Sequence, residues 1–153
     1  MIFISHRGNI YGKQELEENK PEYILECINQ GYECEIDLWF SEGHIFFGHD
    51  LPQYKVPLSF VQENGKYLWV HCKNIEAFTF LHELKDPRIH FFWHQEDDIT
   101  LTSKNIIWAY PGKQPIMNSI AVMPEINNEK ELSSCMGICS DQIKKYKLQY
   151  GDF

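Results

Sequence analysis

The chain has 153 residues, 43% of them hydrophobic and 14% aromatic, which is enough apolar material for one buried core and excludes global disorder. Its formal net charge of −8 argues against a nucleic acid or an anionic membrane as the main partner. The chain has no apolar run of about 18 residues, its first residues do not read as a signal peptide, and its five cysteines fit free thiols. We therefore expect one cytoplasmic domain over residues 1–153.

The first half of the chain predicts strands alternating with helices. Apolar alternation and helical periodicity predict strands over residues 2–5, 32–40, 44–48 and 67–73, helices over residues 21–30 and 75–85, and a helical turn over residues 58–64. Pro21 suits the first turn of its helix, and Gly31 follows the end of that helix. Asn74 is a suitable N-cap for the later helix.

The second half is dominated by predicted strands. We expect strands over residues 89–94, 119–124 and 137–140, a strand-turn-strand unit over residues 100–110, and a helical turn over residues 127–132. Residues 142–153 fit a helix or a coil equally well. Strand-helix alternation favours a mostly parallel sheet or barrel, in which sites collect where the strands end.

Glu35 and Asp37 are the most unusual pair in the chain. In a strand, side chains alternate with period two, so both carboxylates point to the same side. Two like charges on one face of an apolar strand are costly to bury unless a cation lies between them. The pair therefore predicts a metal or phosphate site, while a solvated strand face is the simpler alternative.

Four polar motifs follow one another in the first 50 residues: His6-Arg7-Gly8, Glu18-Asn19, Glu35-x-Asp37 and His49-Asp50. In this order they resemble the motifs of the glycerophosphodiester phosphodiesterases, within the phosphatidylinositol-phospholipase-C-like phosphodiesterase superfamily. A later E-x-K of the family corresponds to His71-Cys72-Lys73, so the lysine matches and the glutamate does not. Beyond residue 75 the similarity is confined to general layout.

The resemblance implies a TIM-type barrel that cleaves a phosphodiester with the help of a divalent metal ion. It implies that His6 and His49 are the general acid-base pair, that Glu35 and Asp37 bind the metal, and that Arg7 and Lys73 contact the phosphate. Such chemistry needs cations to offset the charge that spreads over the phosphoryl oxygens. It also needs two groups that exchange protons near neutral pH, for which histidine is suited.

Two departures from the family affect these expectations. The chain is much shorter than a typical barrel of about 250 residues, so we expect an α/β fold with a compact, shortened TIM-type barrel that lacks some outer helices. A second copy of the chain is one way to complete it. His71 stands where the third carboxylate is expected, and imidazole suits Mn, Zn or Fe better than Mg or Ca. Either His71 binds the metal, or it is a bystander and Glu96 or Asp98 takes that place.

The leading hypothesis is therefore a metal-dependent phosphoric diester hydrolase acting on a small, anionic, glycerophosphodiester-like substrate, with Mg, Ca or Mn as cofactor. A second hypothesis is a non-catalytic module of the same fold that binds phosphate or metal. A third is a lyase that only forms a cyclic phosphate. His71 and the short length motivate the second hypothesis, and the sequence leaves all three open.

Overall fold

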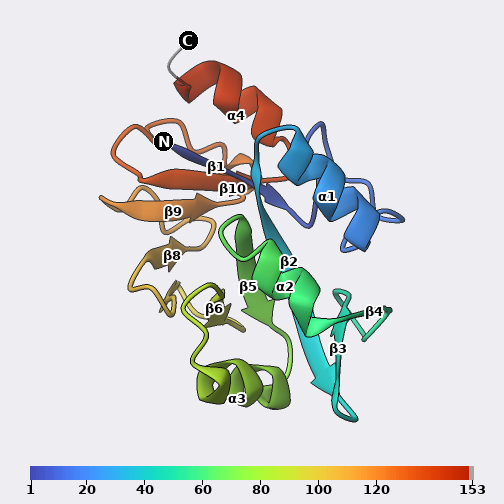
Figure 1. Ribbon diagram of the computed structural model, residues 1–153. Helices are drawn as coiled ribbons and strands as arrows, with labels where there is room; N and C mark the ends of the chain where they lie inside the picture. Colours follow the sequence, from blue (N-terminus) through green and yellow to red (C-terminus); the bar gives the residue numbers. More distant parts are fainter. Residues whose placement is uncertain (152–153) are drawn as a thin grey trace.

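The computed structural model describes residues 1–151, which form a mixed ten-stranded sheet curled into a half-barrel (Figure 1). The strands are β1 (Ile2–His6), β2 (Glu33–Ser41), β3 (His44–Phe47), β4 (Tyr54–Val56), β5 (Leu68–Cys72), β6 (His90–Trp93), β7 (Ile99–Leu101), β8 (Ile107–Ala109), β9 (Ser119–Val122) and β10 (Gly137–Ser140). The helices are α1 (Pro21–Asn29), α2 (Leu58–Glu63), α3 (Ile75–Leu84) and α4 (Ile143–Tyr150), with a 3-10 turn, η1, at Pro124–Asn127. No helix of residues 1–151 is long and apolar enough to cross a membrane.

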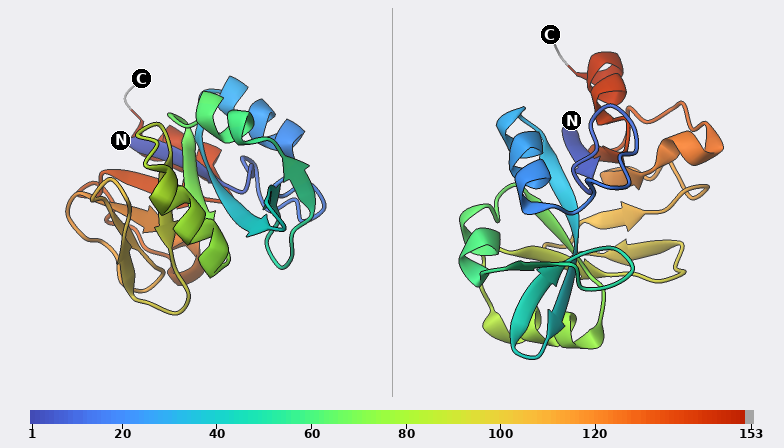
Figure 2. Two further views of the ribbon diagram at one scale, coloured as in Figure 1. Left: turned by 60° about the horizontal axis from the view of Figure 1, so that its bottom comes forward. Right: turned by 90° about the vertical axis from the view of Figure 1, so that its right-hand side faces the viewer.

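The sheet has seven neighbouring parallel strands and gains antiparallel strands at two places. The strands run parallel in the order β6-β5-β2-β1-β10-β9-β8, while β3 and β4 extend it beside β2 and β7 pairs antiparallel with β8. Figure 2 shows how this sheet curls around its own interior. Two register pairs position the site: Glu35 lies opposite His6, and Asp37 lies opposite His71.

The predicted TIM-type barrel is wrong. A TIM barrel needs a helix after each parallel strand, but the connections from β8 to β9 and from β9 to β10 contain no α-helix within the described residues. The β8–β9 connection carries Pro111, Gly112 and Pro115, which prevent a helix there. Strands β3, β4 and β7 are antiparallel, and β6 and β7 share no strand ladder, so the sheet stays open between them.

The individual elements agree better with the sequence than the fold class does. The predicted helices at residues 21–30 and 75–85 and the strands of both halves are present within a few residues. Asn74 caps α3 by accepting a hydrogen bond from the Ala77 amide. The predicted helical turn at residues 127–132 is wrong, because the turn starts earlier, at Pro124. In the undecided tail, α4 ends at Tyr150, and residues 152 and 153 lie outside the described part of the chain.

Two apolar clusters hold the sheet in its curved shape. The larger one packs the helices against the outer face of the sheet, with Ile24 of α1, Leu81 of α3 and Ile143 of α4 as buried contacts. The smaller one fills the inside of the curl and consists of Ile4, Trp69, Phe92, Trp108, Ile120, Val122 and Cys139. Because the smaller cluster fills the inside of the curl, open space remains towards the carboxyl ends of the parallel strands.

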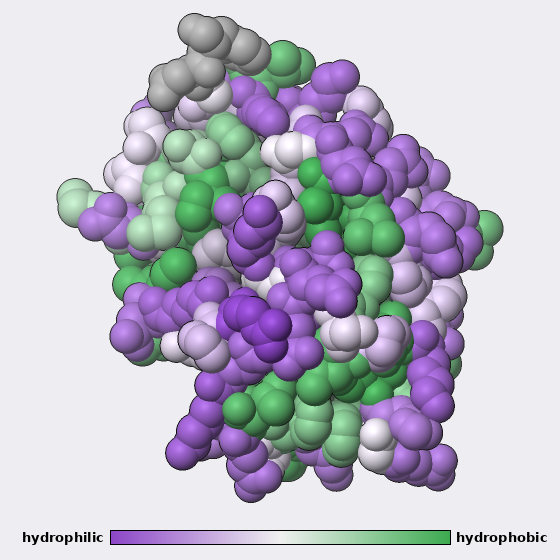
Figure 3. Space-filling model, in the orientation of Figure 1, coloured by the Kyte–Doolittle hydropathy of each residue, from purple (hydrophilic) through white to green (hydrophobic). Residues whose placement is uncertain are grey.

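Polar and apolar side chains are interspersed over the face of the molecule drawn in Figure 3.

Candidate functional site

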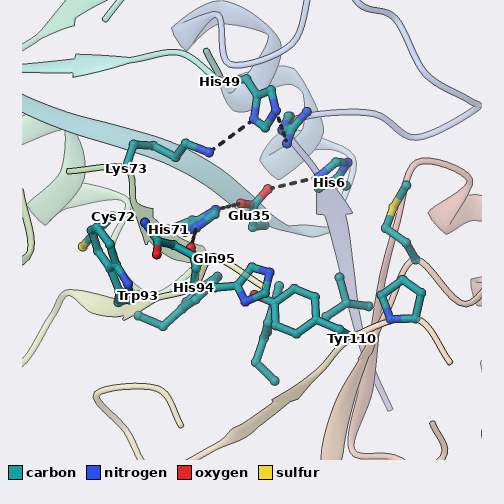
Figure 4. A pocket seen from close by; sticks show the side chains of 16 residues that line it. His6, Glu35, His49, His71, Cys72, Lys73, Trp93, His94, Gln95 and Tyr110 are labelled. Atoms are coloured by element: carbon teal, nitrogen blue, oxygen red, sulfur yellow. Dashed lines mark hydrogen bonds and ion pairs between the residues drawn. The ribbon is translucent and has the colours of Figure 1, made fainter. Parts of the chain in front are cut away.

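A pocket of about 440 Å³ lies at the carboxyl ends of the parallel strands (Figure 4). One side of it carries titratable groups from β1, β2, β5 and the loop after β3. These groups are His6, Arg7, Glu35, His49, His71 and Lys73. The structure therefore brings the predicted catalytic, metal-binding and phosphate-binding residues to one place, with Asp37 buried directly behind them.

Glu35 and Asp37 lie in the parallel half of β2 and point to the same side. Both are buried, with 3% and 0% of their surfaces exposed, so they do not form a solvated strand face. The His71 Nδ1 atom lies 3.1 Å from Asp37 Oδ1 and 3.7 Å from Glu35 Oε1. The imidazole thus contacts both acids, and a metal or phosphate site at this pair stays a prediction.

Asp37 is the electrostatic centre of the site. Arg7 Nε lies 2.8 Å from its Oδ2 atom, and His49 Nδ1 lies 3.3 Å from the same oxygen. Lys73 Nζ lies 3.5 Å from Oδ1. Burial raises the pKa of Asp37, but hydrogen bonds from His49 and His71 and the charge of Arg7 outweigh burial and hold this pKa well below its usual value.

Asn19 fixes the position of Asp37 from the preceding loop. Its side-chain amide donates to Asp37 Oδ2 at 2.9 Å, and its carbonyl accepts from the Asp37 backbone amide at 2.9 Å. The neighbouring Glu18 accepts from Arg7 Nη1 at 3.2 Å and from Asn9 Nδ2 at 2.8 Å. The Glu18-Asn19 pair therefore orients the charged groups and does not face the pocket.

His71 is held in place from both ends of its ring. Its Nε2 atom donates to the His94 carbonyl at 3.2 Å, so Nδ1 is the atom that faces the carboxylates. The ring stacks on Phe92 with centroids 5.2 Å apart. Burial lowers the pKa of His71, but the hydrogen bonds to Asp37 and Glu35 outweigh burial and raise the pKa to about 9.

The donor set of Glu35, Asp37 and His71 fits a divalent metal ion. One ligand atom from each residue lies within 4.8 Å of the others. Glu35 Oε2 is buried and has no hydrogen-bond partner among the described residues. Asp37 Oδ1 is buried and lies 3.1 Å from His71 Nδ1 and 3.5 Å from Lys73 Nζ. Mixed carboxylate and imidazole ligands suit Mn, Zn or Fe. Because a metal ligand must be deprotonated, an ion here would displace the proton that the carboxylates otherwise hold on His71.

The alternative ligands Glu96 and Asp98 do not join this group. Both lie in the exposed loop after β6, and Asp98 pairs with Lys113 at 3.1 Å. His94, just before that loop, lines the pocket and stacks on Tyr110. Burial, followed by the charges of His71 and Lys73, lowers the pKa of His94 to about 4.

His6 has a partner that sequence reasoning missed. Its Nδ1 atom lies 2.8 Å from Asp141 Oδ1, and its Nε2 atom lies 3.9 Å from Glu35 Oε2. Burial lowers the pKa of His6, but the hydrogen bond to Asp141 and the charge of Glu35 raise it overall. Asp141 directly follows the last strand, and an acidic residue at that position was the available signal.

The local backbone aims Arg7 and His49 at the pocket. Arg7 and Gly8 both have positive φ values, 55° and 94°, which turns the chain sharply after β1. A side chain at Gly8 would collide with the ring of Tyr23. His49 follows Gly48, and its side chain remains 43% exposed at the mouth, 3.5 Å from both Arg7 Nη2 and Lys73 Nζ.

Comparison with protein-family models, curated proteins and solved structures finds no match for this chain.

Proposed function

We propose that this chain is a metal-dependent phosphoric diester hydrolase acting on a small, glycerophosphodiester-like substrate. The observation that supports the proposal is the meeting of His6 and His49 with the Glu35/Asp37 pair at one pocket. The resemblance to the glycerophosphodiester phosphodiesterases rests on the same residues and is part of the proposal.

Arg7 and Lys73 are the proposed phosphate contacts. Both line the pocket, and both lie close to His49. Both also pair with Asp37, and Arg7 pairs with Glu18 as well. A diester carries one negative charge, and fixed cations in a pocket of low polarity stabilise the additional charge that develops on its equatorial oxygens.

We assign the proton transfers from the environments of the two imidazoles. Asp141 stabilises the charged form of His6, so His6 gives its proton to the leaving alcohol as the bond from phosphorus to that oxygen breaks. His49, at the open mouth, takes the proton of the attacking hydroxyl of the glycerol part as the new bond from oxygen to phosphorus forms, which gives a cyclic phosphate. Water then attacks the phosphorus and gives its proton to the neutral His6, while His49 returns its proton to the ring oxygen as the bond from that oxygen to phosphorus breaks. This second step opens the cyclic phosphate and restores both imidazoles.

Glu35, Asp37 and His71 would hold the divalent ion, which can be Mg, Ca or Mn. When bound, such an ion offsets negative charge on the phosphoryl oxygens as a Lewis acid. The two carboxylates and His71 supply the ligand atoms on one wall of the pocket.

The experiment is hydrolysis of glycerophosphoglycerol with Mg²⁺, Mn²⁺ or Ca²⁺ added in turn, followed by phosphorus NMR. We expect His6→Gln and His49→Gln each to lower kcat by about 10²–10⁴-fold. His44→Gln is the matched control, because His44 is exposed at the start of β3 and away from the pocket. Equal turnover by the wild type and both pocket variants would remove these two residues from the mechanism.

A second candidate function is a module that binds a phosphorylated ligand or a metal without cleaving it. The observation that favours it is His71, an imidazole in contact with both acids where the resembled enzymes have a carboxylate. Ligand binding without turnover under every metal would support this alternative. A cyclic phosphate that accumulates without opening would instead indicate a lyase.

A further inference from the structure

The loops after β6 and β8 supply a second part of the pocket lining. His94 and Gln95 follow β6, and Tyr110 follows β8. These strands are the two outer members of the parallel run, and the rings of His94 and Tyr110 stack with centroids 3.3 Å apart. In Figure 4 both rings lie across the pocket from His49. The stack therefore joins the two ends of the parallel run on the side of the pocket away from His49.

Polar atoms of these loops form part of the surface that a ligand meets. Phe92, Trp108 and Val122 also line the pocket, but they are almost fully buried and contribute little surface. Gln95 is exposed, and its side-chain amide offers two donors and one acceptor. Tyr110 adds a hydroxyl group to the same part of the lining.

The Tyr110 hydroxyl is a donor without an acceptor. Its oxygen is buried and has no hydrogen-bond partner among the described residues. The indole of the neighbouring Trp108 carries only a donor, so it offers the phenolic proton no acceptor. Burial raises the pKa of Tyr110 well above its usual value, so the proton stays on the oxygen. A buried donor in this state is unfavourable, and a ligand oxygen placed beside it would relieve the cost.

The phosphate has better partners elsewhere in the pocket. Arg7 and Lys73 provide positive charge beside His49. By contrast, His94 is neutral near pH 7, because burial lowers its pKa to about 4, and Tyr110 is neutral as well. Hydrogen bonds to an anion are stronger when the donor is charged. The neutral groups are therefore left for the uncharged part of the substrate.

The direction of the reaction indicates which part of the substrate reaches Tyr110. In phosphoryl transfer the attacking and leaving oxygens lie roughly in line on opposite sides of the phosphorus. His49 is the proposed base for the attacking hydroxyl, so the leaving alcohol points away from His49. Tyr110 lies on that side of the pocket (Figure 4). The leaving alcohol, and not the glycerol that attacks, therefore meets Tyr110.

We propose that Tyr110 is a specificity-determining residue that donates a hydrogen bond to a hydroxyl group of the leaving alcohol, with Gln95 as a second contact. This inference rests on the proposed function and specifies its substrate class, because it makes the leaving group a polyhydric alcohol. The rim residues Pro111 and Met123 contact its carbon atoms. A pocket of about 440 Å³ suits a small alcohol of this kind.

The test compares two diesters of glycerol phosphate, one esterified with a second glycerol and the other with 1-propanol, which has the same carbon skeleton without the additional hydroxyls. Tyr110→Phe removes only the hydroxyl and keeps the ring that stacks on His94. We expect it to lower kcat/KM at least about tenfold for the glycerol diester and to leave the propyl diester within about twofold, because only the glycerol diester loses a hydrogen bond. Tyr11→Phe is the matched control, because Tyr11 is 68% exposed and does not line the pocket.

Binding of both diesters is measured in parallel by calorimetry on the His6→Gln protein, with and without Tyr110→Phe. A loss of about tenfold confined to the glycerol diester supports the inference even if neither diester is cleaved, in which case only the proposed function fails. An equal loss for both diesters would place Tyr110 at the phosphate or at the shared glycerol, and no loss would leave it without a ligand contact. Either of these results overturns the inference and leaves the proposed function standing if turnover occurs.

Discussion

His6 Nδ1 lies 2.8 Å from Asp141 Oδ1, and this contact joins the ends of β1 and β10, which are parallel neighbours in the sheet. Asp141 also accepts a hydrogen bond from Asn9 Nδ2 at 2.8 Å. The carboxylate therefore has a fixed position and holds the His6 ring with Nε2 toward Glu35.

Asp141→Asn should lower kcat for diester hydrolysis by at least about tenfold, because the imidazole loses the group that stabilises its charged form. The carboxylate raises the pKa of His6, so its removal should shift the limb of the pH-rate profile that belongs to His6 toward lower pH. The matched control is Asp98→Asn, which removes an exposed carboxylate outside the charged side of the pocket. An unshifted profile with reduced kcat would point to a purely structural role for Asp141.

Glu35→Gln should weaken Mn²⁺ binding by at least about tenfold, because a neutral amide replaces a buried carboxylate whose Oε2 atom has no hydrogen-bond partner among the described residues. We expect Mn²⁺ to raise the Tm of the wild type by mass action and to leave that of the variant nearly unchanged. Calorimetric titration measures the affinity directly.

The control for this experiment is Glu33→Gln. Glu33 lies on the same strand and accepts a hydrogen bond from Trp69 Nε1, which a glutamine oxygen can also accept. Glu33 does not line the pocket. Equal Mn²⁺ affinity of both variants would argue against Glu35 as a ligand.

Asn19→Ala should lower the free energy of unfolding by about 2–4 kcal/mol, because it leaves the buried Asp37 amide without its hydrogen bond and removes one of the donors to Asp37 Oδ2, which keeps its contacts with Arg7 and His49. Asn19 has a φ of 63°, so part of any loss comes from alanine in the left-handed region. Asn105→Ala controls for that part, because Asn105 has a φ of 60° and is exposed. Denaturant unfolding of the three proteins separates the two contributions, and similar losses in both variants would contradict the prediction.

His90 should make the protein less stable as the pH falls from about 6.5 to about 4. It is buried between Trp69 and Thr102, and burial, followed by the charge of Lys104, lowers its pKa to about 4. In this window the unfolded chain binds a proton that the folded chain does not, so the free energy of unfolding rises with pH. Above the unfolded pKa, His90 is neutral in both states and the loss of stability is absent. Below the folded pKa, the loss in the free energy of unfolding reaches at most about 3 kcal/mol.

The measurement is the Tm between pH 4 and pH 7 for the wild type, His90→Gln and His82→Gln. The His90 variant should depend less on pH in this window, whereas His82 is exposed on α3 and its variant should follow the wild type. Parallel curves for all three proteins would show that His90 does not contribute.

The sequence was most informative where a property depends on neighbouring residues. Period-two alternation places Glu35 and Asp37 on one face whatever the strand pairs with, and the structure has them so. The same holds for α1, where proline at the start and glycine after the end mark the helix, and for the Asn74 cap of α3.

The fold class could not be read from the same patterns, because it depends on which strands pair and on what connects them. Short strands such as β7 and β8 carry little periodicity, and nothing local distinguishes an antiparallel pair at an open edge from two members of a closed barrel. The family resemblance ended before residue 75, so the second half, where the barrel prediction failed, had no motif to guide it.

By itself the sequence singled out six polar groups, two imidazoles, two acids and two cations, and the strand alternation that puts the two acids on one face. Only the tertiary structure decided that Asp141 reaches His6 across 135 positions of the chain and that side chains from β6, β8 and β9 line the same pocket as these groups. Those relationships arise from strand register and from the curl of the sheet, which many distant packing contacts set together.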